Sequence, residues 1–210
     1  MAKLLYIRCN LKPRERSRSR TMAGAFLDEY RRLHPTDQVE TIDLYHDDIP
    51  RIDEDIVTAW ESLRAGIPFG ALTAAQQQKM GRLSELADQF ASSDKYVFAT
   101  PMWNLGFPAE VKMYIDAVCV VGKTFKYTPH GKVGLLKGLG KKCLHLHSSG
   151  SLHYGQNEDH SAPYLNDIMN FVGVEDFQAI VLAGVDAFPE RAEELKAQAV
   201  EHAVAAAASF

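Results

Sequence analysis

Short apolar runs alternate with longer amphipathic stretches along the whole chain, and this alternation is the feature that most restricts its fold. The apolar runs have the length of buried strands, and the stretches between them have apolar residues at helical spacing. Strands are expected at 3–8, 38–44, 95–100, 141–149 and 176–184. Helices are expected at 19–33, 73–93, 109–121, 162–174 and 189–210. A regular β-α alternation of this kind predicts a parallel sheet with helices on both faces.

Five strands in this order favour a doubly wound α/β fold with the flavodoxin-like strand order 2-1-3-4-5. The chain of 210 residues is long enough for one substantial core, and no linker rich in Pro, Gly or Ser divides it. We therefore expect a single domain over residues 1–210. Two stretches lie outside the alternation. Residues 45–70 are assigned no element, and residues 122–138 are expected to form a small hairpin before the fourth strand.

Composition indicates a soluble cytoplasmic protein. Hydrophobic residues make up 46% and charged residues 24% of the chain, which is ordinary for a globular protein. No apolar run approaches the roughly 18 residues of a membrane helix, and the start of the chain lacks the apolar core of a secretory signal. The three cysteines, Cys9, Cys119 and Cys143, lie far apart without metal-ligand spacing, so reduced thiols are expected.

A run of alternating arginines, Arg14 to Arg20 in the letters RERSRSR, stands out in a chain whose formal net charge is -4. It lies between the first expected strand and the first expected helix, where open α/β sheets bind ligands. Free N–H groups, hydroxyls and guanidinium groups there favour an anion. Neither G-x-G-x-x-G nor G-x-x-x-x-G-K-[ST] is present, which leaves a monophosphate rather than a dinucleotide or triphosphate.

Two other interpretations of the arginine run compete with a phosphate site. A solvated basic loop, with Ser17 or Ser19 as a simple helix cap, accounts for this segment about as well when it is taken alone. Nucleic-acid binding is disfavoured because the chain is acidic overall and no aromatic platform is interleaved with the arginines.

Two further loops are expected at the same edge of the sheet. The loop after the third strand is framed by Pro101 and Pro108 and carries Met102, Trp103 and Asn104, an apolar surface that suits a flat aromatic ligand. The loop after the fourth strand has small residues whose N–H groups can approach a ligand. Together the three loops offer a phosphate site, a stacking surface and backbone donors. A planar ring on a monophosphate tail fits them, and flavin mononucleotide (FMN) is the candidate.

The stretch from Pro101 to Gly138, PMWNLGFPAEVKMYIDAV followed by TFKYT, resembles FMN-dependent NADH azoreductases, the flavodoxin-like NADH:quinone oxidoreductases of bacteria. The similarity extends from the first strand to the last, and the opening KLLYIRCNLKPRERSRS resembles the family's strand and phosphate loop. The resemblance implies that three groups of residues bind FMN. They are Ser17, Arg18 and Ser19 for the phosphate, Pro101, Met102, Trp103, Asn104 and Leu105 around the ring, and Ser148, Ser149, Gly150 and Ser151 at its other polar edge.

The resemblance also marks departures from the family pattern. Cys9 stands near the phosphate where relatives often have serine, Ser149 replaces a frequent arginine, and Ser151 replaces a frequent glycine. The loss of that arginine affects the expected tuning of the flavin and the substrate preference more than flavin binding itself.

The activity implied is the two-electron, ping-pong transfer of a hydride from NADH or NADPH through FMN to a quinone or an azo compound. No Ser-His-Asp set or metal cluster is recognised, and flavin chemistry needs neither. Relatives imply a homodimer with active sites at the subunit interface. Two alternatives stay open: a flavodoxin-like electron carrier that does not oxidise NADH, and a non-catalytic binding protein on the same fold.

Several single residues have competing interpretations. Asn104 is expected near the reactive nitrogen of the flavin. His153 can assist proton delivery or be a surface residue without a role, and Tyr127 can line the substrate pocket or only pack. Phe171 can reach the partner subunit's site or belong to the core. No metal is expected at His145 and His147, because no third ligand lies near them in sequence.

Overall fold

A computed structural model of the chain describes residues 1–152 and 158–210. Its central sheet has five parallel strands in the order β2-β1-β3-β6-β7. In this order the strands are Gln38–Asp43, Lys3–Arg8, Lys95–Pro101, Lys142–Ser148 and Asp176–Leu182. The expected order 2-1-3-4-5 and the single flavodoxin-like domain are therefore confirmed.

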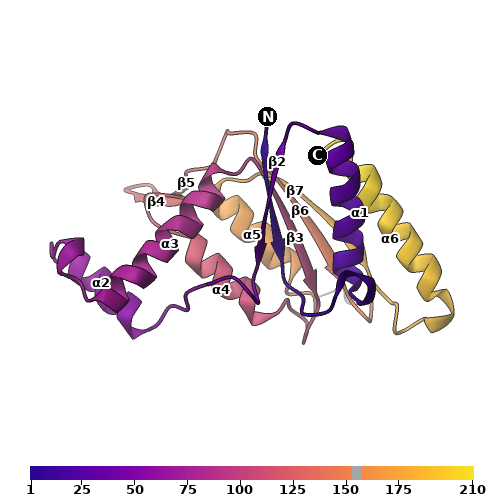
Figure 1. Cartoon of the computed structure of the whole chain (residues 1–210), viewed down its shortest axis with the longest axis horizontal. Coiled ribbons are helices and arrows are strands. Elements are labelled where there is room, and N and C mark those ends of the chain that lie inside the picture. Colours follow the sequence, from indigo (N-terminus) through magenta and orange to yellow (C-terminus); the bar gives the residue numbers. More distant parts are fainter. Residues whose placement is uncertain (153–157) are drawn as a thin grey trace.

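Helices cover both faces of the sheet (Figure 1). Helices α1 (Arg18–Leu33) and α6 (Ala192–Ala207) lie side by side on one face. Helices α3 (Ala74–Ser92), α4 (Ala109–Val118) and α5 (Ala162–Val172) cover the other face. All strands of the sheet point their carboxyl ends toward the lower edge in Figure 1, so the loops that follow β1, β3, β6 and β7 meet there.

Small residues explain how closely α1 and α6 pack. On α6 the buried positions are alanines, and they face the aromatic side chains Phe26 and Tyr30 of α1 within one core cluster. The ring of Phe26 packs edge to face on Phe210, which closes the end of the chain onto this cluster. An alanine-rich helix buries little area per residue, so close approach to large aromatic partners is what fixes α6 on the sheet.

One helix was not expected from the sequence. Helix α2 (Glu54–Arg64) forms within the stretch 45–70, to which no element was assigned. It buries only Ile56 and Ala59, and Trp60 stays 40% exposed. Helix α2 packs on α3 and lies outermost in Figure 1. Its apolar residues Ile56, Ala59, Trp60 and Leu63 have helical spacing, so the sequence did carry a signal for this helix.

A hairpin and three short 3₁₀ turns complete the described chain. The expected hairpin is present as strands β4 (Phe125–Thr128) and β5 (Gly131–Gly134), which pair antiparallel. Short 3₁₀ turns occur at Arg14–Arg16, Phe69–Ala71 and Pro189–Arg191, so the last helix begins three residues later than expected. Within the described residues, no helix is both long and apolar enough to cross a membrane.

Candidate cofactor site

A cavity of about 570 Å³ lies at the carboxyl edge of the sheet, where the loops after β1, β3, β6 and β7 converge. Its size falls in the usual range for a cofactor pocket. One end is formed by the basic loop between β1 and α1, and the other end by the loop after β3. The lining residues are Asn10, Leu11, Lys12, Arg16, Ser17, Arg18, Pro101, Met102, Trp103, Ser148, Gly150 and Asp186.

The basic loop ends at the first turn of α1, and Ser17 is the helix cap. Its hydroxyl accepts a hydrogen bond from the N–H of Arg20 at 3.3 Å, and the N–H of Thr21 donates to the Ser17 carbonyl at 2.8 Å. The N–H groups of Arg18 and Ser19 precede the first helical hydrogen bond and so have no helical acceptor. These two donors and the positive end of the helix dipole favour an anion at this end of the cavity.

The four arginines of the run differ in what they contact. Arg14 pairs with Asp28, Arg20 donates to the Lys12 carbonyl, and Arg18 makes a bidentate pair with Asp186 at 3.0 and 2.5 Å. The guanidinium of Arg18 lowers the pKa of the Asp186 carboxyl. The Arg16 side chain has no hydrogen-bond or ion-pair partner in the described part of the chain, and it lines the cavity. Arg16 therefore offers an uncompensated positive charge.

The loop after β3 forms a tight two-residue turn. Trp103 and Gly106 exchange both backbone hydrogen bonds, at 2.7 and 3.1 Å, and the residues between them have φ of +49° for Asn104 and +66° for Leu105. Positive φ is tolerated by asparagine and costs leucine on the order of 1 kcal/mol. The turn leaves Trp103 about half exposed at the cavity wall. This arrangement presents an apolar surface at the open end of the site.

The loop after β6 supplies the third wall. The N–H of Ser149 donates to the Leu182 carbonyl at 2.8 Å, and its hydroxyl donates to the Ser151 carbonyl at 2.9 Å. Both donors of Ser149 therefore hold the loop in place. Gly150 lines the cavity, and a Cβ there would lie 2.2 Å from the Asp186 carboxylate. A side chain at this position would push the Asp186 carboxylate aside.

The structure brings seven of the expected site residues to the cavity wall: Ser17, Arg18, Pro101, Met102, Trp103, Ser148 and Gly150. The others do not line it within one chain, and His153 lies outside the described residues. Cys9 is fully buried at the end of β1, and burial raises the pKa of its thiol to about 12. Ser19 is buried too, and its hydroxyl has no partner among the described residues. The remaining residues outside the wall are Asn104, Leu105, Ser149, Ser151, Tyr127 and Phe171.

Tyr127 and Phe171 lie together on the hairpin side of the molecule. Tyr127 is an exposed residue of β4, and its ring meets that of Phe125 edge to face. The ring of Phe171 packs against Phe125 at 4.6 Å, with the ammonium group of Lys132 over it at 4.5 Å. Neither side chain reaches the cavity of its own chain.

Sequence reasoning missed five residues of the cavity wall: Asn10, Leu11, Lys12, Arg16 and Asp186. Asn10 to Lys12 directly follow β1, and Asp186 follows the end of β7. Both positions lie at the carboxyl edge of the sheet. The rule that ligands bind at this edge, which placed the loops after β1, β3 and β6, could therefore have found them. Arg16 belongs to the run already singled out, but its contacts could not be read from the sequence.

Two histidines are buried just below this edge. Thr100 Oγ1 lies 2.8 Å from His145 Nε2 and 3.0 Å from His147 Nδ1, and burial lowers the pKa of His147 to about 4. A single hydroxyl proton cannot serve both rings, so one ring accepts from Thr100 and the other donates to it. Within residues 1–152 and 158–210, no three His, Cys, Asp or Glu side chains come together as a metal site.

These residues fit an FMN. The unpaired Arg16 and the free N–H groups at the start of α1 suit its phosphate, and the loop from Pro101 to Trp103 suits a flat ring. Gly150, which has no side chain, also lines the cavity.

Comparison with known proteins agrees with this geometry. A family model described as a flavodoxin-like fold matches residues 2–206. The chain is 60% identical over 210 residues to an FMN-dependent NADH:quinone oxidoreductase of Geotalea uraniireducens (strain Rf4), with 100% of both chains covered. It is 57% identical over 210 residues to the protein of the same name from Trichlorobacter lovleyi, again with 100% of both chains covered.

Solved structures give the same result. An azoreductase from Bacillus anthracis superposes with a TM-score of 0.91 at 32% identity, and 100% of each chain is covered. An FMN-dependent NADH-azoreductase from the same species, solved in complex with FMN, has a TM-score of 0.88 at 32% identity, with 99% of this chain and 100% of that chain covered.

Proposed function

This chain belongs to the family of FMN-dependent NADH:quinone oxidoreductases, and on that premise we propose that it binds FMN, oxidises NADH and reduces quinones or azo compounds. The observation that carries the proposal is the cavity at the carboxyl edge, with an unpaired Arg16 at one end and Trp103 at the other. A charged end and an apolar end match the two ends of a flavin mononucleotide.

The phosphate end would be held by Arg16 and by the N–H groups of Arg18 and Ser19. The Arg18 side chain is neutralised by Asp186, so its part is to keep Asp186 packed on Gly150 and to shape the cavity wall. Charge-assisted hydrogen bonds from Arg16 supply the strong contact to a phosphate.

The ring end would be held between the Pro101–Trp103 segment and the loop after β6. The N–H of Met102 donates to the Ser148 carbonyl at 2.7 Å, which fixes the two loops to each other. FMN, when bound, supplies the redox chemistry by taking a hydride from a nicotinamide and passing two electrons on. Gly150 lines the cavity, and its N–H would stabilise negative charge on a bound ring.

We propose a ping-pong order for the two substrates. NADH and the acceptor are both flat, and the exposed Trp103 side of the cavity provides one stacking surface for them. One molecule at a time fits such a surface, so the oxidised nicotinamide leaves before the quinone enters.

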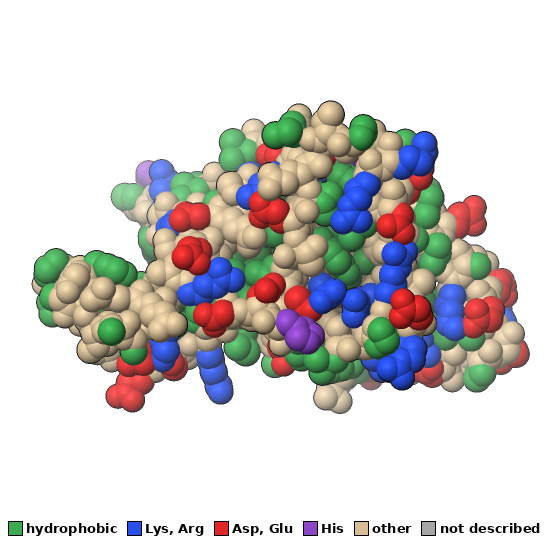
Figure 2. Space-filling view, viewed as in Figure 1, with side chains coloured by type: hydrophobic (Ala, Val, Ile, Leu, Met, Phe, Trp, Pro, Cys, Tyr) green, Lys and Arg blue, Asp and Glu red, His purple; other side chains and the backbone are tan. Residues whose placement is uncertain are grey.

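We also propose that the enzyme is a homodimer. Four large hydrophobic residues, Val57, Trp60, Ile67 and Phe69, are 40 to 46% exposed at the far end of the molecule and form what we call the α2 patch. Figure 2 shows hydrophobic side chains gathered on this projecting end. Patches of this kind mark protein interfaces. A second copy also accounts for Tyr127 and Phe171, which can contribute to a site only across an interface.

The enzyme is proposed to act in the cytoplasm. All three cysteines are free thiols, and two of them, Cys9 and Cys143, are buried. Unpaired cysteines are typical of reducing compartments.

The test of the function is an anaerobic absorption spectrum of the FMN-reconstituted protein, recorded before NADH, after NADH and after a benzoquinone. We expect the flavin band to bleach with NADH and to return with the quinone. A band that forms but does not bleach with NADH or NADPH would identify an electron carrier. A protein that takes up no flavin would refute the proposal.

A further inference from the structure

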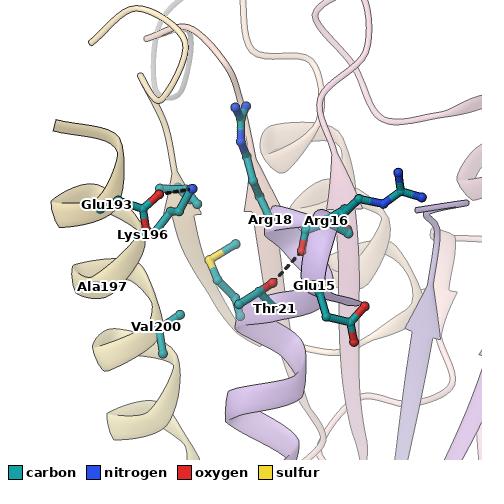
Figure 3. A pocket seen from close by; sticks show the side chains of 11 residues that line it. Glu15, Arg16, Arg18, Thr21, Glu193, Lys196, Ala197 and Val200 are labelled. Atoms are coloured by element: carbon teal, nitrogen blue, oxygen red, sulfur yellow. Dashed lines mark hydrogen bonds and ion pairs between the residues drawn. The ribbon is translucent and has the colours of Figure 1, made fainter. Parts of the chain in front are cut away.

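A second cavity, of about 680 Å³, opens between the first turn of α1 and helix α6 (Figure 3). It shares Arg16, Ser17 and Arg18 with the cofactor cavity, so the two spaces meet at the proposed phosphate position. The second cavity begins where an FMN would end. The residues already assigned to FMN binding leave this space unexplained.

One side of the second cavity is apolar. Met22 of α1, Leu182 at the end of β7, and Ala197 and Val200 of α6 line it. In Figure 3 Ala197 and Val200 lie on consecutive turns of α6 and face the start of α1. A wall of this kind suits the face of a planar base.

The other side carries charges of both signs. Arg18 lies at the junction of the two cavities, and Lys196 of α6 lines the second one, paired with Glu193 at 2.5 Å. Both members of that pair are at the surface, where such pairs contribute little, so Lys196 can exchange Glu193 for a phosphate. Glu15 also lines the cavity and can accept hydrogen bonds from ribose hydroxyls or a base amino group.

We propose that this second cavity binds an adenylate group joined to the flavin phosphate, so that the chain accepts flavin adenine dinucleotide (FAD) as well as FMN. The inference rests on the proposed flavin function. Arg16 and the start of α1 hold the first phosphate, and Lys196 lies beside the second. The base rests on the apolar wall of α6.

The experiment is a titration of the flavin-free protein with FMN and, separately, with FAD, followed by the change in flavin absorption and fluorescence on binding. The variant Ala197→Glu places a carboxylate on the cavity wall, at an exposed helix position where the fold tolerates it. The variant Gln198→Glu is the matched control, since it adds the same charge on the next residue, which does not line the cavity.

We expect the unmodified protein to bind FAD with a dissociation constant within about tenfold of that for FMN. Ala197→Glu should weaken FAD at least about tenfold, because it places a charged carboxylate on the apolar wall where the base would rest, and leave FMN within about twofold. Gln198→Glu should change neither. FAD that does not bind while FMN does, or a loss of FAD affinity equal in both variants, overturns the inference alone. A protein that binds neither flavin overturns the proposed function as well.

Discussion

At the scale of single residues, the arginine run separates into structural and ligand-facing members. Arg14 and Arg18 form ion pairs with Asp28 and Asp186, and Arg20 binds a backbone carbonyl. Arg16 has no such partner in the described chain. A guanidinium that lines a cavity and has no counter-charge is suited to an anionic ligand, and this distinction leads to a test.

Arg16→Ala should weaken FMN about tenfold to a hundredfold, the effect of losing a charge-assisted hydrogen bond. Riboflavin has the same ring without the phosphate, so its affinity should stay the same. Arg14→Ala is the matched control, since Arg14 does not line the cofactor cavity. Titration with both flavins measures this. Equal loss of riboflavin and FMN would show that Arg16 does not face the phosphate.

The sequence predicted the basic loop but could not assign its individual roles. Arg18 was expected to hold the phosphate, and its partner Asp186 lies 168 positions further along the chain. A pairing at that separation depends on strands β1 and β7 ending at the same edge, which is a tertiary fact. What the sequence can show is the charge of the loop and its place before α1.

The buried histidines make stability depend on pH. The pKa of His147 falls to about 4 in the folded protein through burial, and Asp159 is the charged group whose attraction opposes that fall. The unfolded chain takes up a proton below about pH 6.5 and the folded chain does not, so stability is lost as pH drops from about 7 to 4. The loss due to His147 is on the order of 3 kcal/mol.

Denaturant unfolding at pH 7.5, 6.0 and 5.0 checks this expectation. His147→Gln should reduce the pH dependence without removing it, because burial also lowers the pKa of the neighbouring His145. This holds whatever the effect of the substitution on stability at pH 7.5. His202→Gln, at an exposed position of α6, should keep the wild-type dependence. An unchanged slope in His147→Gln would mean that this ring does not titrate differently on folding.

At the scale of elements, helix α2 shows that a short surface helix is easier to overlook than a buried strand. The strands of the sheet were found because burial on both faces gives continuous apolar runs. Helix α2 has helical spacing at Ile56, Ala59, Trp60 and Leu63, but it packs on α3 and leaves Val57 and Trp60 exposed, so its apolar face is only partly buried. Its start does have a local signal, because the Asp53 side chain accepts from the N–H of Ile56 at 3.2 Å.

That cap can be tested separately from the ion pairs around it. Asp53 and Asp55 both pair with Lys79, at 2.5 and 2.6 Å, but only Asp53 caps α2. Asp53→Ala should therefore lower the free energy of unfolding by about 1 kcal/mol. Asp55→Ala should lower it by less than about 0.5 kcal/mol, because a surface ion pair is weak. Equal effects in thermal or denaturant unfolding would show that the cap contributes nothing beyond the ion pair.

At the scale of the whole molecule, one chain holds the parts of a cofactor site but lacks part of the expected substrate site. The cavity has a cationic end and an apolar wall within one chain. Tyr127 and Phe171 lie away from it: Tyr127 is part of the hairpin, and Phe171 of α5 packs against it. The α2 patch projects from the opposite side of α3, away from the sheet. A second copy seated on exposed apolar surface would supply what one chain lacks.

Phe69→Glu places a charge in the α2 patch and should convert a dimer to a monomer in sedimentation at micromolar concentration, because burying an unpaired charge is costly. Quinone reduction should fall with dimer content, and FMN binding should persist because Phe69 does not line the cofactor cavity. Leu33→Glu is the control, since Leu33 is an exposed apolar residue at the end of α1. A wild-type protein that sediments as a monomer with full activity would remove the dimer from the proposal and assign the whole reaction to one chain.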